Sequence, residues 1–307
     1  MTLYPLSLKY SIVILEKKYK LLKIQPLYIQ LQILEEISFQ DLLSSFGMSK
    51  QKMKHYVYQF QGKTYSNIHT ILPKSKIIIP LSVEKHDYIC IDAPIEILYE
   101  DMFCVIVNKP SGILVHPDGQ CLDSLQTRLN AHLKQENWPY GAQAIHRIDR
   151  ETSGLVLFSK FPFFQSLFDT MMQQHQYTKE YYCLVQGNTH FKNTPCDLSI
   201  ARDRHHASKM RISKRGKEAH SIFTTIQNFQ NESLVKAQII TGRKHQIRVH
   251  LQALGHPICN DPLYGSIEDK RKLCLQNNYL SFIHPITKES LCFDLDVDPR
   301  FQINPIK

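Results

Sequence analysis

A charged loop runs directly into a short apolar segment at residues 146–158. Asp149 lies between Arg147 and Arg150, and a Thr-Ser-Gly turn separates it from the apolar residues 155–158. This segment is short, bounded and rich in branched side chains, so it predicts a buried strand rather than a helix. A carboxylate in a loop that enters a buried strand is held in place for chemistry. The alternative is an Asp-Thr-Ser turn that only caps the strand.

Strand-like and helical segments alternate along the rest of the chain. Branched or alternating apolar residues predict strands at residues 104–107, 180–185, 217–229, 233–240, 280–285 and 290–295. Helical spacing predicts helices at residues 124–134, 163–172 and 243–254, the last ending before Gly255. Strands joined both by turns and by helices predict an α+β fold, with a mixed, mostly antiparallel central sheet and flanking helices.

The first third of the chain has its own pattern. The expected elements are some strand before residue 36, a helix from Ser38 to Gly47, a helix from Ser49 to Gly62 and a strand at residues 76–83. The second helix would bury one face and expose a basic one. We expect Met53, Val57 and Phe60 on its buried face and Lys50, Lys52 and Lys54 on its exposed face.

We expect a linker at residues 84–94, which divides the chain into a small N-terminal domain, 1–87, and a larger domain, 88–307. Two short helices followed by strands resemble the small RNA-binding module that a small-subunit ribosomal protein shares with many RNA-modifying enzymes. The glycine and asparagine turns expected between the strands of that module are largely missing here. A basic helix face exposed to solvent explains the same pattern.

Composition and charge narrow the class of protein. An apolar content of 43% and a charged content of 21% are ordinary for a globular protein, and the net charge of +9 predicts a polyanionic partner, either nucleic acid or an anionic membrane surface. No stretch approaches the roughly 20 apolar residues of a membrane span, and the apolar run at residues 11–15 is too short for a signal core. Eight scattered cysteines without a Cys-x-x-Cys pair indicate reduced thiols in a cytoplasmic protein.

The expected helix at residues 243–254 carries two arginines near its start. The helix dipole disfavours cations there, so an anionic partner is expected for Arg243 and Arg248. A phosphate or a buried carboxylate such as Asp149 would meet that need. A solvated basic helix is the alternative.

Several other kinds of site are not indicated. His245, His250 and His256 lack the spacing of a zinc site, and no Glu lies between them in the pattern of a metalloprotease. The chain also has no glycine-rich dinucleotide fingerprint, no phosphate-binding loop lysine and no Gly-x-Ser-x-Gly elbow. We therefore expect no metal, no nucleotide cofactor and no serine-hydrolase chemistry.

Two longer motifs resemble those of a known family. His-Arg-Ile-Asp-Arg-Glu-Thr-Ser-Gly-Leu at 146–155 and Gly-Arg-Lys-His-Gln-Ile-Arg-Val-His at 242–250 are similar to the signatures of the RluA-type pseudouridine synthases. Shorter matches follow the family's order at residues 99–101, 107–112, 115–117, 255–258, 261 and 264–265. The resemblance covers roughly residues 88–297. Asn260 stands where the family usually has glycine, a difference that touches a turn.

The resemblance implies the pseudouridine synthase fold and the isomerisation of uridine to pseudouridine in structured RNA, ribosomal or transfer RNA, without cofactor or metal. By position, Asp149 matches the catalytic aspartate, Tyr181 the active-site tyrosine and Arg248 the basic residue paired with the aspartate. The chemistry agrees, since the reaction needs an ionised carboxylate as nucleophile or base, and a guanidinium fork would keep Asp149 ionised and oriented.

A basic segment at residues 202–217 holds seven Lys or Arg in sixteen residues. We expect it to be a strand-linking loop that lies on RNA phosphates, although a disordered, solvated loop would have the same composition. The residues expected to bind RNA are Arg147, Lys209, Arg211, Lys214, Arg243 and His245. RNA is the expected partner of a monomeric enzyme.

An RNA-binding protein of the same fold that has lost catalysis, acting in ribosome assembly, is the competing hypothesis. The two hypotheses differ in the site residues, because a retired enzyme would be expected to have lost one of Asp149, Tyr181 and Arg248. All three are present. The sequence therefore favours the enzyme.

Overall fold

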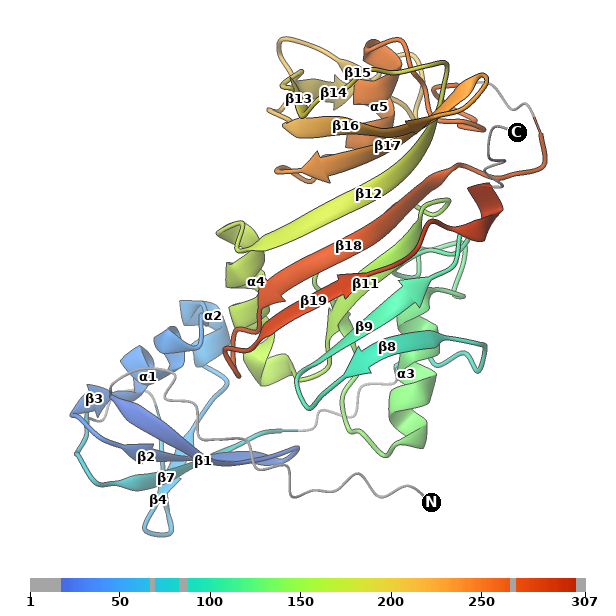
Figure 1. Ribbon diagram of the computed structural model, residues 1–307. Helices are drawn as coiled ribbons and strands as arrows, with labels where there is room; N and C mark the ends of the chain where they lie inside the picture. Colours follow the sequence, from blue (N-terminus) through green and yellow to red (C-terminus); the bar gives the residue numbers. More distant parts are fainter. Residues whose placement is uncertain (1–17, 67–69, 83–87, 266–268, 302–307) are drawn as a thin grey trace.

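The computed structural model describes residues 18–66, 70–82, 88–265 and 269–301. The apolar run at 11–15 and residues 84–87 of the expected linker lie outside these ranges. Two sheets organise the described chain, a small one near the N-terminus and a large one after it (Figure 1). Within the described part, no helix is long and apolar enough to cross a membrane.

The small sheet has five strands in the order β1-β2-β7-β4-β5. Its strands are β1 (Tyr19–Gln25), β2 (Tyr28–Ile33), β4 (Tyr58–Phe60), β5 (Lys63–Tyr65) and β7 (Lys76–Pro80), beside a short pair formed by β3 (Ile37–Ser38) and β6 (Thr70–Ile71). Two helices accompany it, α1 (Phe39–Ser45) and α2 (Lys50–Met53). Ser38 and Ser49 cap these helices as expected, each accepting a hydrogen bond from a backbone N–H of the first turn.

The second helix is much shorter than expected, because the chain turns into the β4–β5 hairpin. Gln61 and Gly62 both have positive φ, 49° and 76°, and they join the paired residues Phe60 and Lys63. This two-residue connection matches the turn that the right-handed twist of a hairpin favours. The expectation that Val57 and Phe60 lie on one helix face is therefore wrong, and Gly62 ends a hairpin turn rather than a helix.

The large sheet has ten strands, and its main path runs β13-β16-β17-β12-β18-β11-β9-β8. The strands are β8 (Glu96–Glu100), β9 (Cys104–Lys109), β10 (Gln143–Ala144), β11 (Ser153–Ser159), β12 (Tyr177–Gln186), β13 (Thr194–Cys196), β16 (Ser221–Asn228), β17 (Glu232–Ile239), β18 (Leu275–Ile283) and β19 (Ser290–Asp294). All its pairings are antiparallel except that of β11 with β18. The expected α+β fold with a mostly antiparallel sheet is confirmed.

Three further helices flank the large sheet: α3 (Leu125–Gln135), α4 (Gln165–Gln173) and α5 (Gln246–Ala253). Short 3-10 helices occur at Pro162–Phe164, directly before α4, and at Pro299–Phe301. Ser124 caps α3 with a reciprocal capping box. The helices expected at 124–134 and 163–172 are confirmed, while α5 begins three residues later than expected.

The alternating side chains of β9 divide the core into two layers. Val105 and Val107 belong to the cluster that contains the apolar residues of α3, whereas Cys104 and Ile106 belong to the cluster on the other face. All seven residues of β11 are buried. A strand buried on both faces explains why residues 155–158 are continuously apolar.

The small unit packs against the second of these layers. The ring of Phe46, after α1, lies 4.9 Å from that of Phe163, centroid to centroid. Lys52 of α2 donates from Nζ to the Pro162 carbonyl at 3.0 Å and to the Ser166 hydroxyl at 3.2 Å. Lys52 was expected on an exposed basic face, and it instead makes polar contacts between the two units, as does Tyr140, whose hydroxyl donates to the Pro26 carbonyl.

The parallel contact between β11 and β18 is short and joins the two halves of the large sheet. Ser153 and Gly154 pair with Gln276 and Asn277, after which β18 pairs with β19 instead. Gly154 has φ of +109°, and a Cβ atom there would lie 2.1 Å from the Asn277 carbonyl oxygen. Only glycine fits this position.

We predict that Gly154→Ala lowers the free energy of unfolding by about 3 kcal/mol or more, from backbone strain and overpacking together. Urea denaturation measures the loss. Gly119→Ala is the matched control, because Gly119 has no neighbouring atom within 4 Å of an added Cβ. Equal stability of the two variants would contradict this account of the junction.

Candidate active site

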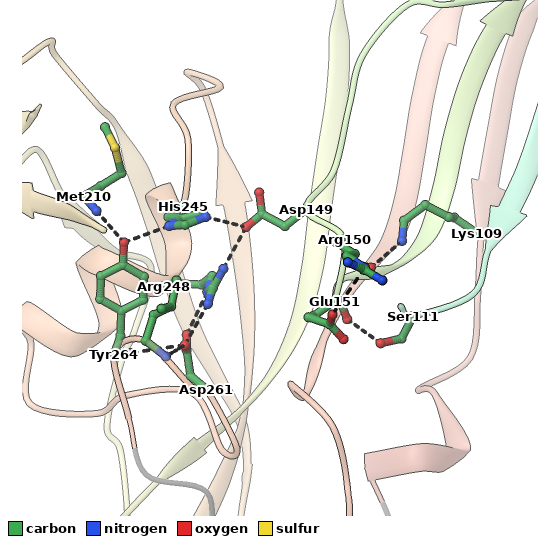
Figure 2. Close-up of polar contacts among 11 residues, drawn as sticks. Lys109, Ser111, Asp149, Arg150, Glu151, Met210, His245, Arg248, Asp261 and Tyr264 are labelled. Carbon is green, nitrogen blue, oxygen red and sulfur yellow. Dashed lines mark hydrogen bonds and ion pairs between the residues drawn. The ribbon is translucent and has the colours of Figure 1, made fainter. Parts of the chain in front are cut away.

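Asp149 lies in the loop between β10 and β11, immediately before the junction of the two half-sheets. Its carbonyl accepts a hydrogen bond from the Thr152 N–H at 3.1 Å, which closes the turn into β11. The side chain is partly exposed, and Oδ2 faces two side chains of the α5 region. Arg248 Nη1 lies 3.2 Å from Oδ2 and His245 Nε2 lies 3.8 Å from it (Figure 2). Within the described chain, Oδ1 has no hydrogen-bond partner.

Arg248 is buried in the first turn of α5 and contacts two carboxylates. Its Nε and Nη2 donate to the two oxygens of Asp261, each at 2.8 Å, while Nη1 reaches Asp149. The expectation of a two-pronged fork onto Asp149 is therefore wrong, because the fork binds Asp261. Burial alone would lower the pKa of Arg248, but its hydrogen bonds with Asp261 reverse the effect, so the guanidinium stays charged.

Asp261 is fully buried and held by more than the arginine. Its Oδ1 also accepts hydrogen bonds from the backbone N–H groups of Leu263 and Tyr264. Sequence reasoning assigned it no role. Its place in a family-like motif could have pointed to a functional role. The sequence does not reveal, however, which carboxylate binds which nitrogen atoms of an arginine.

Arg243 lies outside the helix, contrary to expectation. Its Nε donates to the Glu218 carbonyl at 2.8 Å and the residue is exposed. The helix starts at Gln246 because His245 has a left-handed backbone, with φ of 56°. The Gln246 side chain accepts from the Arg243 N–H and the Thr241 hydroxyl, which fixes this turn. Of the two arginines, only Arg248 therefore lies near the start of the helix, where the helix dipole makes an anionic partner favourable.

We expected His245 to bind RNA, and its side chain lies beside Asp149 with 8% of its surface exposed. Its Nδ1 lies 2.8 Å from the hydroxyl of Tyr264, and that hydroxyl accepts from the Met210 N–H at 2.7 Å. The Tyr264 ring also lies 5.2 Å from the Arg248 guanidinium. Burial lowers the pKa of His245 to about 4, so the ring is neutral at pH 7. Tyr264 is a second site residue that sequence reasoning missed.

Tyr181 is buried on β12, in the same apolar cluster as Ile148. Burial raises the pKa of its hydroxyl well above the ordinary value, and the charge of nearby Asp149 adds to the effect. The hydroxyl therefore stays protonated and can donate a proton or a hydrogen bond. The structure thus brings Asp149, Arg248 and Tyr181 together.

Lys179 lies two residues before Tyr181 and so on the same face of β12. It is buried, and its Nζ lies 4.8 Å from the centroid of the Tyr177 ring. Burial lowers its pKa to about 8, and among the described residues no acid pairs with it. A buried cation without an acid is costly, and an anionic group of a ligand would relieve that cost.

Lys109 holds the loop that carries Asp149. Its side chain is fully buried and donates from Nζ to the carbonyls of Pro110, Ile113 and Arg150, at 2.9 to 3.0 Å. Figure 2 shows the bond to Arg150, on the loop of Asp149. Ser111 adds a hydrogen bond to the Glu151 carbonyl at 2.7 Å. Burial lowers the pKa of Lys109 to about 7, but three carbonyl acceptors match the three N–H bonds of an ammonium group.

The basic segment forms a hairpin of β14 (Ile200–Arg202) and β15 (Met210–Ile212), not an irregular loop. Its apolar residues pack with Val249 and Tyr264, and this packing seats the hairpin against α5. Arg211 and Lys214 are exposed and Lys209 is partly exposed. Arg147 is exposed on the loop of Asp149. These four cations remain available to a polyanion.

The histidines considered for a metal site bond elsewhere. His250 contacts the Ser221 hydroxyl and the Leu198 carbonyl, and His256 contacts the Gln186 carbonyl. Among the described residues, the one cluster of metal-ligand type is Asp101, Cys104 and His284. In this cluster Nδ1 of His284 and Oδ1 of Asp101 each accept two backbone hydrogen bonds, and Nε2 of His284 lies 3.3 Å from Asp101 Oδ2.

The fold is that of the pseudouridine synthases. A solved structure of human RNA pseudouridylate synthase domain containing 1 superposes with a TM-score of 0.57 at 23% identity, over 72% of this chain and 86% of that one. A family model described as RNA pseudouridylate synthase matches residues 104–253.

Curated relatives give the same result at the level of sequence. An uncharacterized RNA pseudouridine synthase of Bacillus subtilis is 33% identical over 240 residues, which span 76% of this chain and 79% of the relative. A ribosomal large subunit pseudouridine synthase D of Zymomonas mobilis is 31% identical over 229 residues, 69% of this chain and 72% of the relative. The chain belongs to the RluA-type RNA pseudouridine synthases. It is an isomerase, and the findings do not favour the inactive alternative.

We predict that Lys179→Met raises the free energy of unfolding at pH 7 by on the order of 2 kcal/mol, because methionine fills the space without a buried charge. The gain should shrink as the pH rises from about 8 to 10.5. In that range the folded protein, with a pKa of about 8, has lost the proton that the unfolded chain keeps up to its pKa of 10.5, so the wild type becomes relatively more stable.

Urea denaturation between pH 7 and 10 measures both effects. Lys236→Met is the matched control on the neighbouring strand β17, since Lys236 is more exposed and pairs with Glu180 at 3.1 Å. That variant should show no gain at pH 7. A Lys179→Met protein less stable than the control would mean that the lysine has a stabilising partner.

Proposed function

We propose that this isomerase acts on uridine in a structured ribosomal or transfer RNA, with Asp149 as the catalytic carboxylate. The observation that supports this proposal most directly is that the two oxygens of Asp149 have different surroundings. Oδ2 is held by Arg248, and Oδ1 has no partner in the described chain. The anchored oxygen orients the group, and the other oxygen is left for the substrate.

The reaction breaks an N-glycosidic bond and rejoins the uracil through carbon. A carboxylate that stays ionised can serve as nucleophile or as base in such a step. Arg248 Nη1 lies 3.2 Å from Oδ2, and this charge-assisted contact orients the carboxylate. The geometry is equally compatible with attack on the sugar, attack on the base and abstraction of a sugar proton.

The target base must leave its stack to reach Asp149, which costs a few kcal/mol. The ring of Tyr181 offers a stacking surface that returns about 1–3 kcal/mol. Its protonated hydroxyl offers a donor in the same place. Lys179, on the same strand face, offers a cation for a phosphate or a uracil carbonyl.

The RNA-facing surface in this proposal combines the hairpin β14–β15 with the loop of Asp149. Lys209, Arg211 and Lys214 supply charge on the hairpin, and Arg147 and Arg243 supply it closer to the carboxylate. The excess positive charge of the chain supports a polyanionic substrate. Because Asp149, Tyr181 and Arg248 come from one chain, a monomer would suffice, and we place it in the cytoplasm on account of its scattered free thiols.

Asp149→Asn keeps the shape of the side chain and removes its charge. We predict that the single-turnover rate of pseudouridine formation falls by a factor on the order of 10³ or more, while RNA affinity changes little. Asp41→Asn, an exposed aspartate of α1, is the matched control and should keep the wild-type rate. A rate for Asp149→Asn within tenfold of wild type would remove Asp149 from the mechanism.

A second prediction concerns salt. Each contact with a phosphate of single-stranded RNA contributes about −0.7 to the log–log slope of affinity against salt concentration. The triple variant Lys209→Ala, Arg211→Ala, Lys214→Ala should therefore flatten the slope by about 2. A control triple variant at the exposed residues Lys134, Lys192 and Lys288 should leave it unchanged. Equal slopes for the two variants would assign the hairpin charges to solubility alone.

The identity of the RNA requires a cellular experiment. Pseudouridines should be mapped in ribosomal and transfer RNA from cells with and without this gene, and with the Asp149→Asn variant. Sites that disappear in both deficient strains are the substrates. The relative named for the large ribosomal subunit supports ribosomal RNA, and a loss confined to transfer RNA would overturn that preference.

A further inference from the structure

A line of hydrogen-bonding groups connects the basic hairpin to the catalytic carboxylate. It runs from the Met210 N–H to the Tyr264 hydroxyl at 2.7 Å, and from that hydroxyl to His245 Nδ1 at 2.8 Å (Figure 2). Nε2 of the same ring faces Asp149 Oδ2 at 3.8 Å. The line has one backbone donor at its start and one carboxylate acceptor at its end.

Proton counting fixes the direction of the line from its first member. A backbone N–H can only donate, so the Tyr264 oxygen is an acceptor toward Met210. A phenolic hydroxyl has a single proton of its own, which is then free to point at His245 Nδ1. If Nδ1 donated instead, the tyrosine proton would have to find another acceptor. The first arrangement pairs every group, and it makes Nδ1 an acceptor.

The Asp149 carboxylate, at the other end of the line, independently favours the arrangement in which Nδ1 of His245 is an acceptor. A neutral imidazole with Nδ1 as acceptor carries its proton on Nε2, where it faces Asp149 Oδ2. The opposite tautomer would direct the Nε2 lone pair at a carboxylate, which is repulsive. Both ends therefore select the Nε2–H tautomer of His245, and burial keeps the ring neutral.

The backbone at His245 indicates that this placement is imposed by its surroundings. Its φ of 56° is a left-handed conformation that costs a non-glycine residue free energy and persists only where neighbours enforce it. The ring also packs at 80° to the Tyr264 ring, with 5.6 Å between centroids. The side chain is 8% exposed, so the imidazole points into the site and not to solvent.

We propose that His245 is a positioning residue that donates its Nε2–H to Asp149 Oδ2, that Tyr264 fixes its tautomer, and that the hairpin β14–β15 sets this line through the Met210 N–H. RNA that seats the hairpin through Lys209 and Arg211, the neighbours of Met210, closes the distance between Nε2 and Oδ2 to that of a hydrogen bond. The inference rests on the proposed role of Asp149. It adds that the binding of RNA to the hairpin changes the hydrogen bonding of the Asp149 carboxylate.

Tyr264→Phe tests the line because it removes one oxygen and keeps the ring over Arg248. We expect the single-turnover rate at saturating RNA to fall about tenfold, the scale of one lost hydrogen bond in a charged network, with RNA affinity within about twofold of wild type. Tyr279→Phe is the matched control, because the Tyr279 hydroxyl on β18 contacts Cys292 on the neighbouring strand. It should leave the rate unchanged.

The tautomer of His245 can be measured directly, and it should not change in Tyr264→Phe if Tyr264 has only a structural role. Nitrogen-15 NMR of labelled protein at pH 7 should show His245 as the Nε2–H tautomer in the wild type, and a loss of that preference in Tyr264→Phe. An Nδ1–H tautomer in the wild type would overturn the inference. So would a rate for Tyr264→Phe equal to that of Tyr279→Phe.

His245→Asn completes the test, because asparagine tolerates a left-handed backbone but cannot span from Tyr264 to Asp149. Its rate should fall at least as far as that of Tyr264→Phe, and the double variant should be no slower than His245→Asn alone, as expected for residues that act in series. Additive losses would overturn the serial line. Asp149→Asn distinguishes failure of the proposed function from failure of this inference. If Asp149→Asn remains active, the proposed function fails. If it is inactive while Tyr264→Phe and His245→Asn keep the wild-type rate, only this inference fails.

Discussion

The site depends on one buried guanidinium that is shared between two carboxylates. A charge buried as deeply as that of Arg248 must be paired, and Asp261 satisfies this requirement with a two-pronged contact inside the protein. Asp149 is therefore not needed to neutralise the arginine, and the three groups together keep one net negative charge. Had the fork faced Asp149, both of its oxygens would be bound. The observed arrangement orients the reactive carboxylate and leaves part of it available.

The strands were predictable wherever burial leaves a clear mark on the sequence. Residues 155–158 are continuously apolar because β11 is covered on both faces, and the residues of β9 alternate between two core clusters. Local backbone geometry was not predictable in the same way. Apolar spacing extended the second helix to Gly62, although a two-residue turn at Gln61 and Gly62 places a hairpin there. A turn of this kind is fixed by the pairing of its flanking strands, which helical periodicity does not register.

Site residues were predicted by type and place in a motif, but not by orientation. Asp149, Arg248 and Tyr181 do come together, whereas His245 turns inward to Tyr264. Its direction follows from a left-handed backbone and from a tyrosine nineteen positions away, neither of which a one-dimensional pattern reveals. Buried polar residues in general are placed by the partners that satisfy them, and those partners are distant in sequence.

The position of β18 has a consequence for synthesis on the ribosome. This strand follows all the others of the large sheet except β19, and yet it lies between β12 and β11. Until residues 275–283 have been made, the half that carries the loop of Asp149 and the half that carries Tyr181 are joined by no strand between them, and each keeps an unpaired edge. The carboxylate and the tyrosine are thus held in one sheet only after β18 has been made. A ribosome-bound fragment that ends before β18 has no strand to set the Asp149 loop and Tyr181 in register, so the site is assembled by this one late strand.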